Sequence, residues 1–269
     1  MPSITALRSR VESSLAGRIP APFAYRDRRA ADTASSGIPE IDLLAGGLPR
    51  GGLTEICGPP CSGRTSLLLS ALAARTAQAE VCALVDGRDG FDPHAAQAAG
   101  VQLEQLLWVR CREMEQALRA TDLLLRGGGF GLIAVDLADM APETVRGVPL
   151  NAWFRFRRAV EDTPAILLLL EQESNAKTCA SLVLRLDAEP ARWLAAREDS
   201  AANLRHSWTC LLDGFGVRAE KIHARVQPVK QTSFAGGPSA AGAAADAADG
   251  SGIFQTRTEW SYLNQPKTK

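Results

Sequence analysis

The 269-residue chain is 46% hydrophobic and 22% charged, a balance typical of soluble globular proteins. Thirty basic residues match thirty acidic ones, which argues against a protein held on nucleic acid by bulk charge alone. No apolar run is long enough to cross a membrane, and residues 1–18 lack the apolar stretch of a secretory signal, so we expect a cytoplasmic protein with no membrane partner. The six cysteines form no CxxC pair, and we expect reduced core thiols except at Cys61.

The N-terminal segment, residues 1–34, is expected to form a short helix followed by a basic arm. Ile4, Leu7, Val11 and Leu15 have near-helical spacing, which predicts an amphipathic helix over 4–15. Six arginines precede residue 30, against two acidic residues. The arm is either a solvated segment or a docking element for a neighbouring subunit or an acidic partner.

Short apolar runs alternate with amphipathic stretches from residue 53 onward. The runs at 53–57, 81–86, 106–111, 131–136, 165–170 and 181–186 read as strands, and the stretches at 64–78, 92–99, 113–126 and 150–160 read as helices. Apolar strands alternating with helices predict an α/β fold whose central sheet is mostly parallel and flanked by helices. Beyond residue 180 the runs at 207–213 and 216–226 indicate antiparallel strands added to that sheet.

The C-terminal region divides into a linker and an apolar peptide. Residues 231–252 are rich in Ala and Gly and are expected to be disordered, because they bury too little surface to offset their ordering entropy. Residues 253–269 follow as a tail that begins with the apolar stretch IFQTRTEWSYL. That stretch is either a peptide that docks, on a partner or on its own core, or a frayed end.

The sequence GPPCSGRTS at 58–66 has the pattern of a phosphate-binding loop. Its glycines allow backbone N–H groups to approach phosphate, and the N-terminus of the following helix favours an anion. The strand expected at 53–57 and the helix expected at 64–78 supply the required context. The predicted nucleotide-binding residues are Gly58, Pro59, Pro60, Cys61, Ser62, Gly63, Arg64, Thr65 and Ser66.

The predicted cofactors are ATP and Mg²⁺. The hydroxyl of Thr65 suits the Mg²⁺ side of a phosphate loop, and Asp136, at the end of the apolar run GLIAVD, suits the same ion. Arg64 stands where lysine is usual, and its planar fork differs from the compact ammonium of lysine. We expect it to reach phosphate but to fit the transition state less well.

Residues 35–74 and 85–111 carry a family resemblance. SSGIPEIDLLAGGLPRGGLTEICGPPCSGRTSLLLSALAA resembles the start of the RecA-family ATPase core, and VDGRDGFDPHAAQAAGVQLEQLLWVRC continues the likeness to bacterial RecA. The resemblance extends more loosely to about residue 226 and implies a RecA-like ATP-binding core over 35–230. It also implies that Gln172 is near the place of a glutamine that senses the γ-phosphate. An ordinary polar residue at a strand end is the alternative for Gln172.

The departures from the family pattern bear on catalysis and DNA binding. The family's catalytic glutamate falls at Arg88, which cannot act as a base toward water but could bind phosphate. The segments in the places of the two DNA-contacting loops are short. The helix expected at 150–160 has arginines and aromatic residues that could bind single-stranded DNA, although an amphipathic helix with aromatic residues in the core is the favoured interpretation.

A RecA-like core with these changes resembles the ImuA group of accessory proteins in bacterial mutagenic translesion synthesis. The resemblance implies an ATP-binding adaptor in DNA repair and the SOS response with weak or absent hydrolysis, whose partners are polymerase-related repair proteins. The alternative is a divergent recombinase with DNA-stimulated ATPase activity. Single-stranded DNA, RecA and further copies of the chain are additional candidate partners. A small-molecule kinase is disfavoured because residues 137–180 contain no evident substrate lid.

Overall fold

The computed structural model of the chain describes residues 32–161, 163–194, 211–224 and 251–257. The helix expected at 4–15, nearly all of the basic arm, most of the expected linker and the end of the C-terminal peptide lie outside these residues. Everything below concerns the described ranges.

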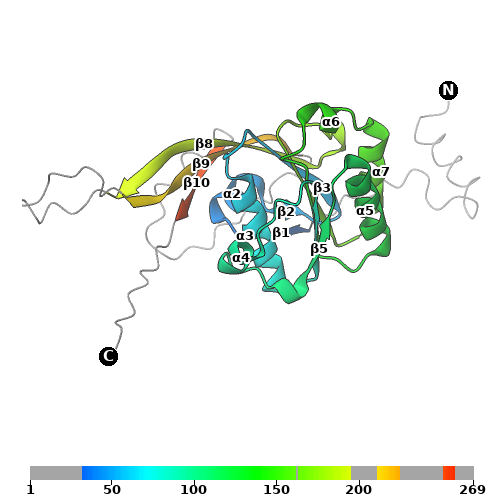
Figure 1. Cartoon of the computed structure of the whole chain (residues 1–269), viewed down its shortest axis with the longest axis horizontal. Coiled ribbons are helices and arrows are strands. Elements are labelled where there is room, and N and C mark those ends of the chain that lie inside the picture. The colour runs from blue at the N-terminus through cyan, green and yellow to red at the C-terminus, as the bar shows by residue number, and fades with distance from the viewer. Residues whose placement is uncertain (1–31, 162, 195–210, 225–250, 258–269) are drawn as a thin grey trace, which may run out of the picture. The chain divides into compact units, whose positions relative to one another are not determined.

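The core is an eight-stranded sheet with the strand order β10-β9-β8-β3-β7-β6-β4-β5 (Figure 1). Strands β3, β7, β6, β4, β5 and β8 pair in parallel, while β9 and β10 are antiparallel to their neighbours. The strands span β3 (Gly52–Cys57), β4 (Cys82–Asp86), β5 (Leu106–Arg110), β6 (Leu132–Asp136), β7 (Ile166–Glu171), β8 (Leu182–Leu194), β9 (Leu211–Ala224) and β10 (Ser251–Arg257). The expected mostly parallel sheet with antiparallel additions is confirmed.

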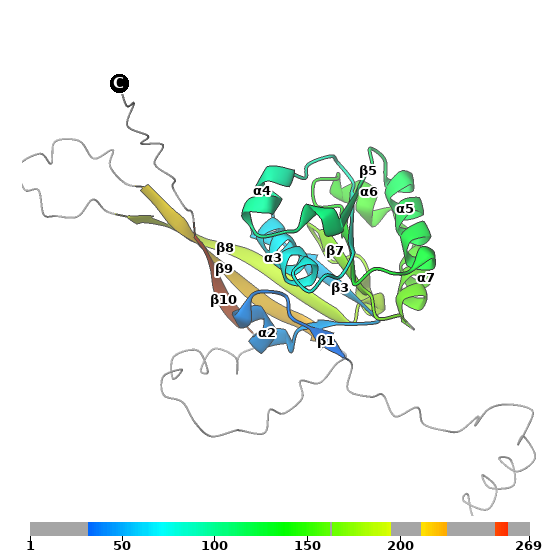
Figure 2. The ribbon, with the colours of Figure 1, turned by 90° about the horizontal axis from the view of Figure 1, so that it is seen from below.

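Helices cover both faces of the parallel part of the sheet. Figure 2 shows α3 (Arg64–Thr76) and α4 (Pro93–Ala98) on one side, with α5 (Met114–Gly127) and α7 (Leu150–Val160) on the other. The short helix α6 (Pro142–Arg146) follows β6, and single 3₁₀ turns, η1 (Leu103–Gln105) and η2 (Lys177–Cys179), precede β5 and β8. These layers explain why every residue of β3 and β7 is buried and why β7 is apolar along nearly its whole length.

Two apolar clusters hold the helices to the sheet. On one face α3 packs Leu67, Leu68, Ala71 and Leu72 against Ile56, Leu84 and Leu168. On the other face Trp153 and Phe156 of α7, both essentially inaccessible to solvent, pack with the strand residues that point the opposite way. The alternation of strand side chains between two helix layers therefore accounts for both cores.

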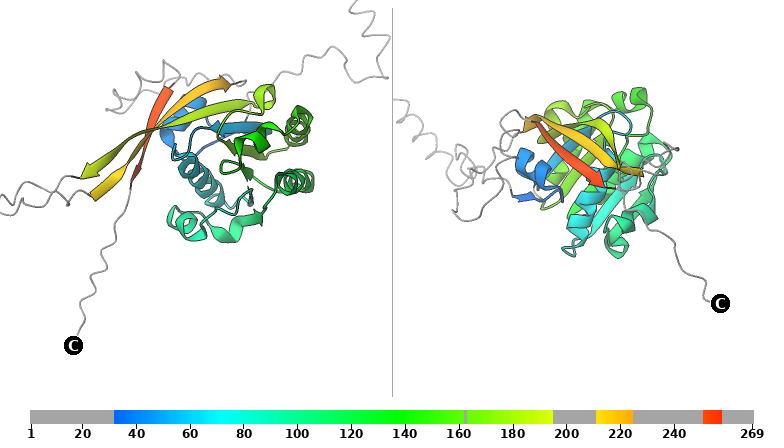
Figure 3. Two further views of the ribbon diagram at one scale, coloured as in Figure 1. Left: turned by 45° about the horizontal axis from the view of Figure 1, so that its top comes forward. Right: turned by 90° about the vertical axis from the view of Figure 1, so that its left-hand side faces the viewer.

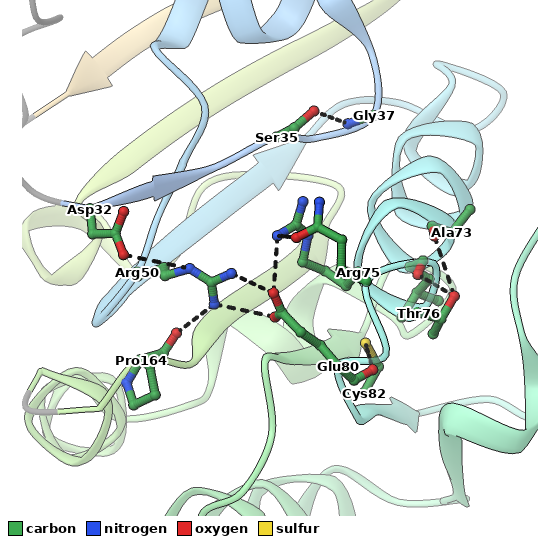
Figure 4. A network of polar contacts seen from close by, with 12 residues as sticks. Asp32, Ser35, Gly37, Arg50, Ala73, Arg75, Thr76, Glu80, Cys82 and Pro164 are labelled. Atoms are coloured by element: carbon green, nitrogen blue, oxygen red, sulfur yellow. Dashed lines mark hydrogen bonds and ion pairs between the residues drawn. The ribbon is translucent and has the colours of Figure 1, made fainter.

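A polar network ties the end of α3 to the turn before β3. Arg50 forms an ion pair with Glu80 at 2.6 Å between Nη2 and Oε1, and its Nη1 donates to the carbonyl oxygen of Pro164 (Figure 4). Arg75, which is 2% exposed, reaches the same carboxylate at 3.2 Å. Glu80 therefore neutralises two arginines from different elements.

A small unit at the start of the core comprises elements that the sequence patterns do not predict. Strands β1 (Thr33–Ala34) and β2 (Leu48–Pro49) pair in antiparallel fashion around helix α2 (Pro39–Ala45). Helix α2 begins with a proline, and Asp42 accepts hydrogen bonds from the Ser35 hydroxyl and the Ser36 amide before the helix. β1 starts two residues before the expected core boundary at residue 35.

The antiparallel part of the sheet differs from expectation in two respects. The expectation of two strands at 207–213 and 216–226 is wrong over the described residues, because β9 runs unbroken from Leu211 to Ala224. Its glycines at 214 and 216 sit in extended pairing rather than in a turn. Residues 251–257 of the C-terminal region form β10, which lies beside β9 (Figure 3). Phe254 of β10 is buried among core residues.

Candidate functional site

The phosphate-loop sequence forms the connection from β3 to α3, and two of its glycines are required by close contacts. A side chain at Gly58 would place its Cβ 2.2 Å from the backbone oxygen of Leu186. Gly63 has a φ of 90°, and a Cβ there would lie 2.6 Å from Val217 of β9. Cys61 also adopts a positive φ of 62°. The loop is thus held in a tight conformation by the strands behind it.

The loop ends in a helix start whose backbone groups suit an anion. No side chain caps the N-terminus of α3 at Gly63, and the 13-residue helix carries no acidic residue in its first turn. The first amides of a helix lack intrahelical partners, so these N–H groups are available to a ligand. Pro59, Pro60 and Cys61 form the exposed rim, while Ser62 is buried and its hydroxyl has no partner within the described residues.

A cavity beside α3 brings together residues from the start of that helix and from the ends of β4 and β6. Thr65 from the start of α3, Arg88 from the turn after β4 and Asp136 from the end of β6 all line it. The remaining lining residues are Leu68, Leu69, Asp86, Gly90, Phe91, Asp92, Ala95 and Asp139. Thr65 and Asp136, the two residues predicted to lie on the Mg²⁺ side, therefore face one space. Ser66 is half-buried and lies next to Thr65 on the helix, outside this lining.

Asp136 is in a desolvated position. Burial raises the pKa of its carboxyl to about 6, and the hydrogen bond from the Ala138 amide, at 3.0 Å, opposes that rise. Arg64 also favours the ionised form, whereas Asp86 and Asp139 disfavour it. A divalent cation would relieve this repulsion among carboxylates.

Arg64 does not extend into the cavity. Its side chain is only 6% exposed, and its Nη1 donates to the backbone oxygen of Glu171, at the end of β7, at 2.9 Å. Burial lowers the pKa of the guanidinium, opposed by the carboxylates of Asp136 and Asp139. The loop's own cation is thus bound to the neighbouring strand.

Gln172 directly follows the strand that holds Arg64. Its backbone oxygen accepts from the Gly58 amide at 3.2 Å, and its Nε2 donates to the Ala138 oxygen at 2.9 Å. Gln172 therefore lies between the start of the phosphate loop and the segment after β6. Its side chain is engaged with protein and is absent from the cavity lining.

Two buried carboxyl groups, which the sequence patterns did not single out, lie below this segment. Glu55 of β3 and Glu171 of β7 are both fully buried on neighbouring strands, and Glu171 accepts a hydrogen bond from Nδ2 of Asn175 at 2.8 Å. Burial and the nearby Glu55 raise the pKa of Glu171 to about 8. Glu55 accepts from the Ser174 hydroxyl and from the amides of Asn175 and Ala176. Glu55 thus has three donors, whereas burial favours the protonated form of Glu171.

The turn that carries Arg88 is held by the buried carboxylate of Asp86. Asp86 accepts hydrogen bonds from the amides of Arg88, Gly90 and Phe91 and from the indole of Trp108. Asp89 pairs with Arg110 of β5. Neither aspartate is therefore free to replace the missing catalytic glutamate.

The segments in the places of DNA-contacting loops are short and internally bonded. Residues 174–176 are held by Glu55, and the segment after β6 is occupied by α6. On α7, Trp153 and Phe156 are buried, and Arg155 pairs with Asp122 of α5. Phe154 remains 45% exposed. Helix α7 is therefore amphipathic, with aromatic residues in the core and arginines on the solvent-facing side.

The described residues contain neither a cluster of metal-binding side chains nor a membrane-spanning helix. No three His, Cys, Asp or Glu side chains there come together as a group that could bind a metal ion. Nor does any helix within these ranges combine the length and apolar character needed to cross a bilayer.

Comparison with known proteins identifies the relatives of this arrangement. The RecA N-terminal domain family matches residues 22–147. This segment is RecA-like. The RecA protein of Ruegeria pomeroyi is 39% identical over 122 residues, which cover 45% of this chain and 35% of that protein. The RecA protein of Psychrobacter cryohalolentis is 42% identical over 104 residues, or 39% of this chain and 29% of that protein.

These matches show a likeness to RecA over this part of the chain. They lie in the half of the chain that forms the phosphate loop, β4 and β6. The aligned part spans about a third of the length of these RecA proteins. Neither match bears on the finer resemblance to the ImuA group.

Proposed function

We propose that this chain is a RecA-like ATP-binding protein of DNA repair and recombination. The observation that carries this proposal is the shared cavity of Thr65 and Asp136 at the N-terminus of an uncapped helix. A helix start, a hydroxyl and a carboxylate around one space suit a nucleotide phosphate bound with Mg²⁺. The buried Ser62 hydroxyl, which has no hydrogen-bond partner among the described residues, could also donate to a phosphate.

The roles follow from these positions. Residues 58–66 would surround the phosphates with backbone N–H groups, and Thr65 and Asp136 would hold Mg²⁺, directly or through water. When bound, Mg²⁺ would neutralise phosphate charge and relieve the repulsion that Asp136 experiences from its neighbours. Gln172 is placed to link the loop start to the segment after β6 and could respond to the terminal phosphate.

Hydrolysis is proposed to be weak. The place of the family's catalytic glutamate is Arg88, and the nearby Asp86 already accepts four hydrogen bonds. A general base typically contributes about 10²–10⁴-fold to a reaction rate, so its loss is a large defect. ATP would then act chiefly as a bound ligand.

The finer proposal is an ImuA-like adaptor of SOS mutagenic translesion synthesis that contacts polymerase-related proteins. It is supported by the short, internally bonded segment 172–176 and by Arg88. The likeness to RecA proteins is equally consistent with a recombinase that binds single-stranded DNA and associates with copies of itself or with RecA.

One experiment separates the two proposals. ATP binding and phosphate release are measured on the purified chain, with and without single-stranded DNA. The adaptor predicts binding with little turnover in both conditions, whereas the recombinase predicts clear stimulation by DNA. Failure to bind Mg·ATP at millimolar concentration would overturn the nucleotide-binding proposal itself.

A further inference from the structure

Arg88 is the only basic residue that lines the cavity in the described structure. Four aspartates, Asp86, Asp92, Asp136 and Asp139, share that lining. A triphosphate that entered a space of this composition would meet strong repulsion from carboxylates. Mg²⁺ offsets part of that repulsion, and any further attraction from the cavity wall has to come from Arg88.

Arg64, the basic residue of the phosphate loop, is bound to a neighbouring strand. Arg64 is buried and donates to the Glu171 oxygen, and leaving that position would strand a buried carbonyl group. A buried carbonyl oxygen left without a donor destabilises such an arrangement. In this arrangement Arg64 is therefore a poor partner for the terminal phosphate.

Arg88 is in the opposite condition. Its side chain is exposed and forms no ion pair or hydrogen bond with any described residue, since only its backbone amide is bonded, to Asp86. The turn beneath it is fixed by Asp86, and Phe91 and Trp108 pack edge to face with ring centroids 5.3 Å apart. Arg88 thus lies on a turn held by hydrogen bonds, and its exposed side chain lines the cavity.

We propose that Arg88 binds the terminal phosphate of a nucleoside triphosphate and makes the site prefer triphosphate to diphosphate. The side chain that replaces a catalytic carboxylate thereby becomes a binding group. A guanidinium can form two parallel hydrogen bonds to a phosphate, and this geometry suits a terminal group with three oxygens. This inference rests on the proposed nucleotide binding and adds the residue that distinguishes the nucleotides.

The test is a titration of the full chain with fluorescent ATP and ADP analogues in the presence of Mg²⁺. Arg88→Ala is expected to weaken triphosphate binding about tenfold or more and diphosphate binding less than threefold. Arg88→Lys keeps the charge but loses the forked guanidinium. Its affinity for the triphosphate is expected to lie between those of the unaltered chain and Arg88→Ala. Arg119→Ala removes an exposed arginine from α5, on the other face of the sheet, and is the matched control with unchanged affinities.

The outcomes distinguish the two levels of the proposal. If the unaltered chain binds both nucleotides and Arg88→Ala leaves the ratio of their affinities unchanged, the assignment of Arg88 is wrong while nucleotide binding stands. If the unaltered chain binds neither nucleotide, the proposed function fails and this inference fails with it. Thermal melting of each variant establishes that a loss of binding does not reflect unfolding.

Discussion

Arg64 Nη1 and the backbone oxygen of Glu171 are 2.9 Å apart, so the basic side chain of the phosphate loop ends on the adjacent strand rather than in the cavity. The side chain of Glu171 accepts a hydrogen bond from Nδ2 of Asn175 at 2.8 Å. The backbone amide of Asn175 donates to Glu55, which also receives donors from Ser174 and Ala176. A continuous set of contacts therefore joins the loop, two central strands and the segment after β7.

Arg64→Ala is expected to destabilise the fold by about 1–3 kcal/mol, because a buried carbonyl loses its donor and a space opens. Urea denaturation measures the change, and Arg119→Ala on the surface of α5 should shift stability by less than about 0.5 kcal/mol. Equal stability of Arg64→Ala and the unaltered chain would mean that Arg64 is not held on β7 in solution.

Glu171→Gln should alter the pH dependence of stability. The folded-state pKa of Glu171, about 8, exceeds its ordinary value of 4.5, so the native state retains a proton that the unfolded chain loses. The contribution of this group to stability is greatest below pH 4.5 and falls as pH rises toward 8. Glutamine can still accept a hydrogen bond from Asn175 through its side-chain oxygen, and it does not titrate.

The variant should therefore gain stability relative to the unaltered chain between pH 5.5 and pH 8. Urea midpoints at several pH values measure the difference. Glu173→Gln, at an exposed position two residues further on, is the control and should run parallel to the unaltered chain. Parallel curves for Glu171→Gln as well would show that Glu171 is ionised in the folded state.

Glu80→Ala is expected to destabilise the protein by about 1–3 kcal/mol. The carboxylate neutralises Arg50 and the nearly inaccessible Arg75, and its removal leaves both cations without that partner. Glu173→Ala breaks an exposed ion pair with Arg146 and should cost less than about 0.5 kcal/mol. Similar thermal shifts for the two variants would contradict the structural importance of the Glu80 network.

Cys61 offers a chemical probe of the phosphate loop. It is exposed, whereas the other described cysteines, Cys57, Cys82, Cys111 and Cys179, are buried. A nucleotide bound over the loop should hinder access, so Mg·ATP is expected to slow alkylation of Cys61 several-fold. Peptide mass spectrometry measures the rate at this residue alone. Undiminished alkylation at saturating nucleotide would place the ligand elsewhere.

An Arg64→Lys, Arg88→Glu double variant should gain ATPase activity. It restores the usual loop cation and a carboxylate that can orient water, and an increase of about tenfold or more in phosphate release is expected. Arg64→Lys, Arg88→Ala carries the same loop change without the carboxylate and should show no such gain. If the first variant also shows none, the site has lost more than these two groups.

The parallel half of the fold could be predicted from sequence because its apolar runs have the length of strands and its helices have clear periodicity. The runs containing Leu53 and Leu167 correspond to β3 and β7 with boundaries shifted by one residue. Two features could not be predicted from these patterns. The runs at 207–213 and 216–226 read as two strands, yet cross-strand pairing keeps Gly214 and Gly216 extended within the single strand β9. Helix α2 is short, and its start depends on Asp42 accepting from Ser35 and Ser36.

The site was predictable in its sequence-local parts only. The loop, Thr65 and Asp136 follow from motif spacing, and the parallel pairing of strands brings them to one edge. The capture of Arg64 by β7 depends on a contact between residues 107 positions apart. Likewise, Glu55 and Glu171 read as isolated acidic residues in apolar runs until β3 and β7 are paired. An acidic residue in an otherwise apolar strand was the available signal.

The position of β10 has a consequence for how the protein is synthesised. Phe254 belongs to the same apolar cluster as α2 and α3, and Gly252 lies against the backbone of α2. The ribosome synthesises these residues after all the remaining strands of the sheet. Until then the free edge of β9 and the surface of α2 remain uncovered on the nascent chain, where an open strand edge invites pairing with other chains. The edge of β9 and the surface of α2 are therefore covered only when β10 has emerged, after the other strands of the sheet.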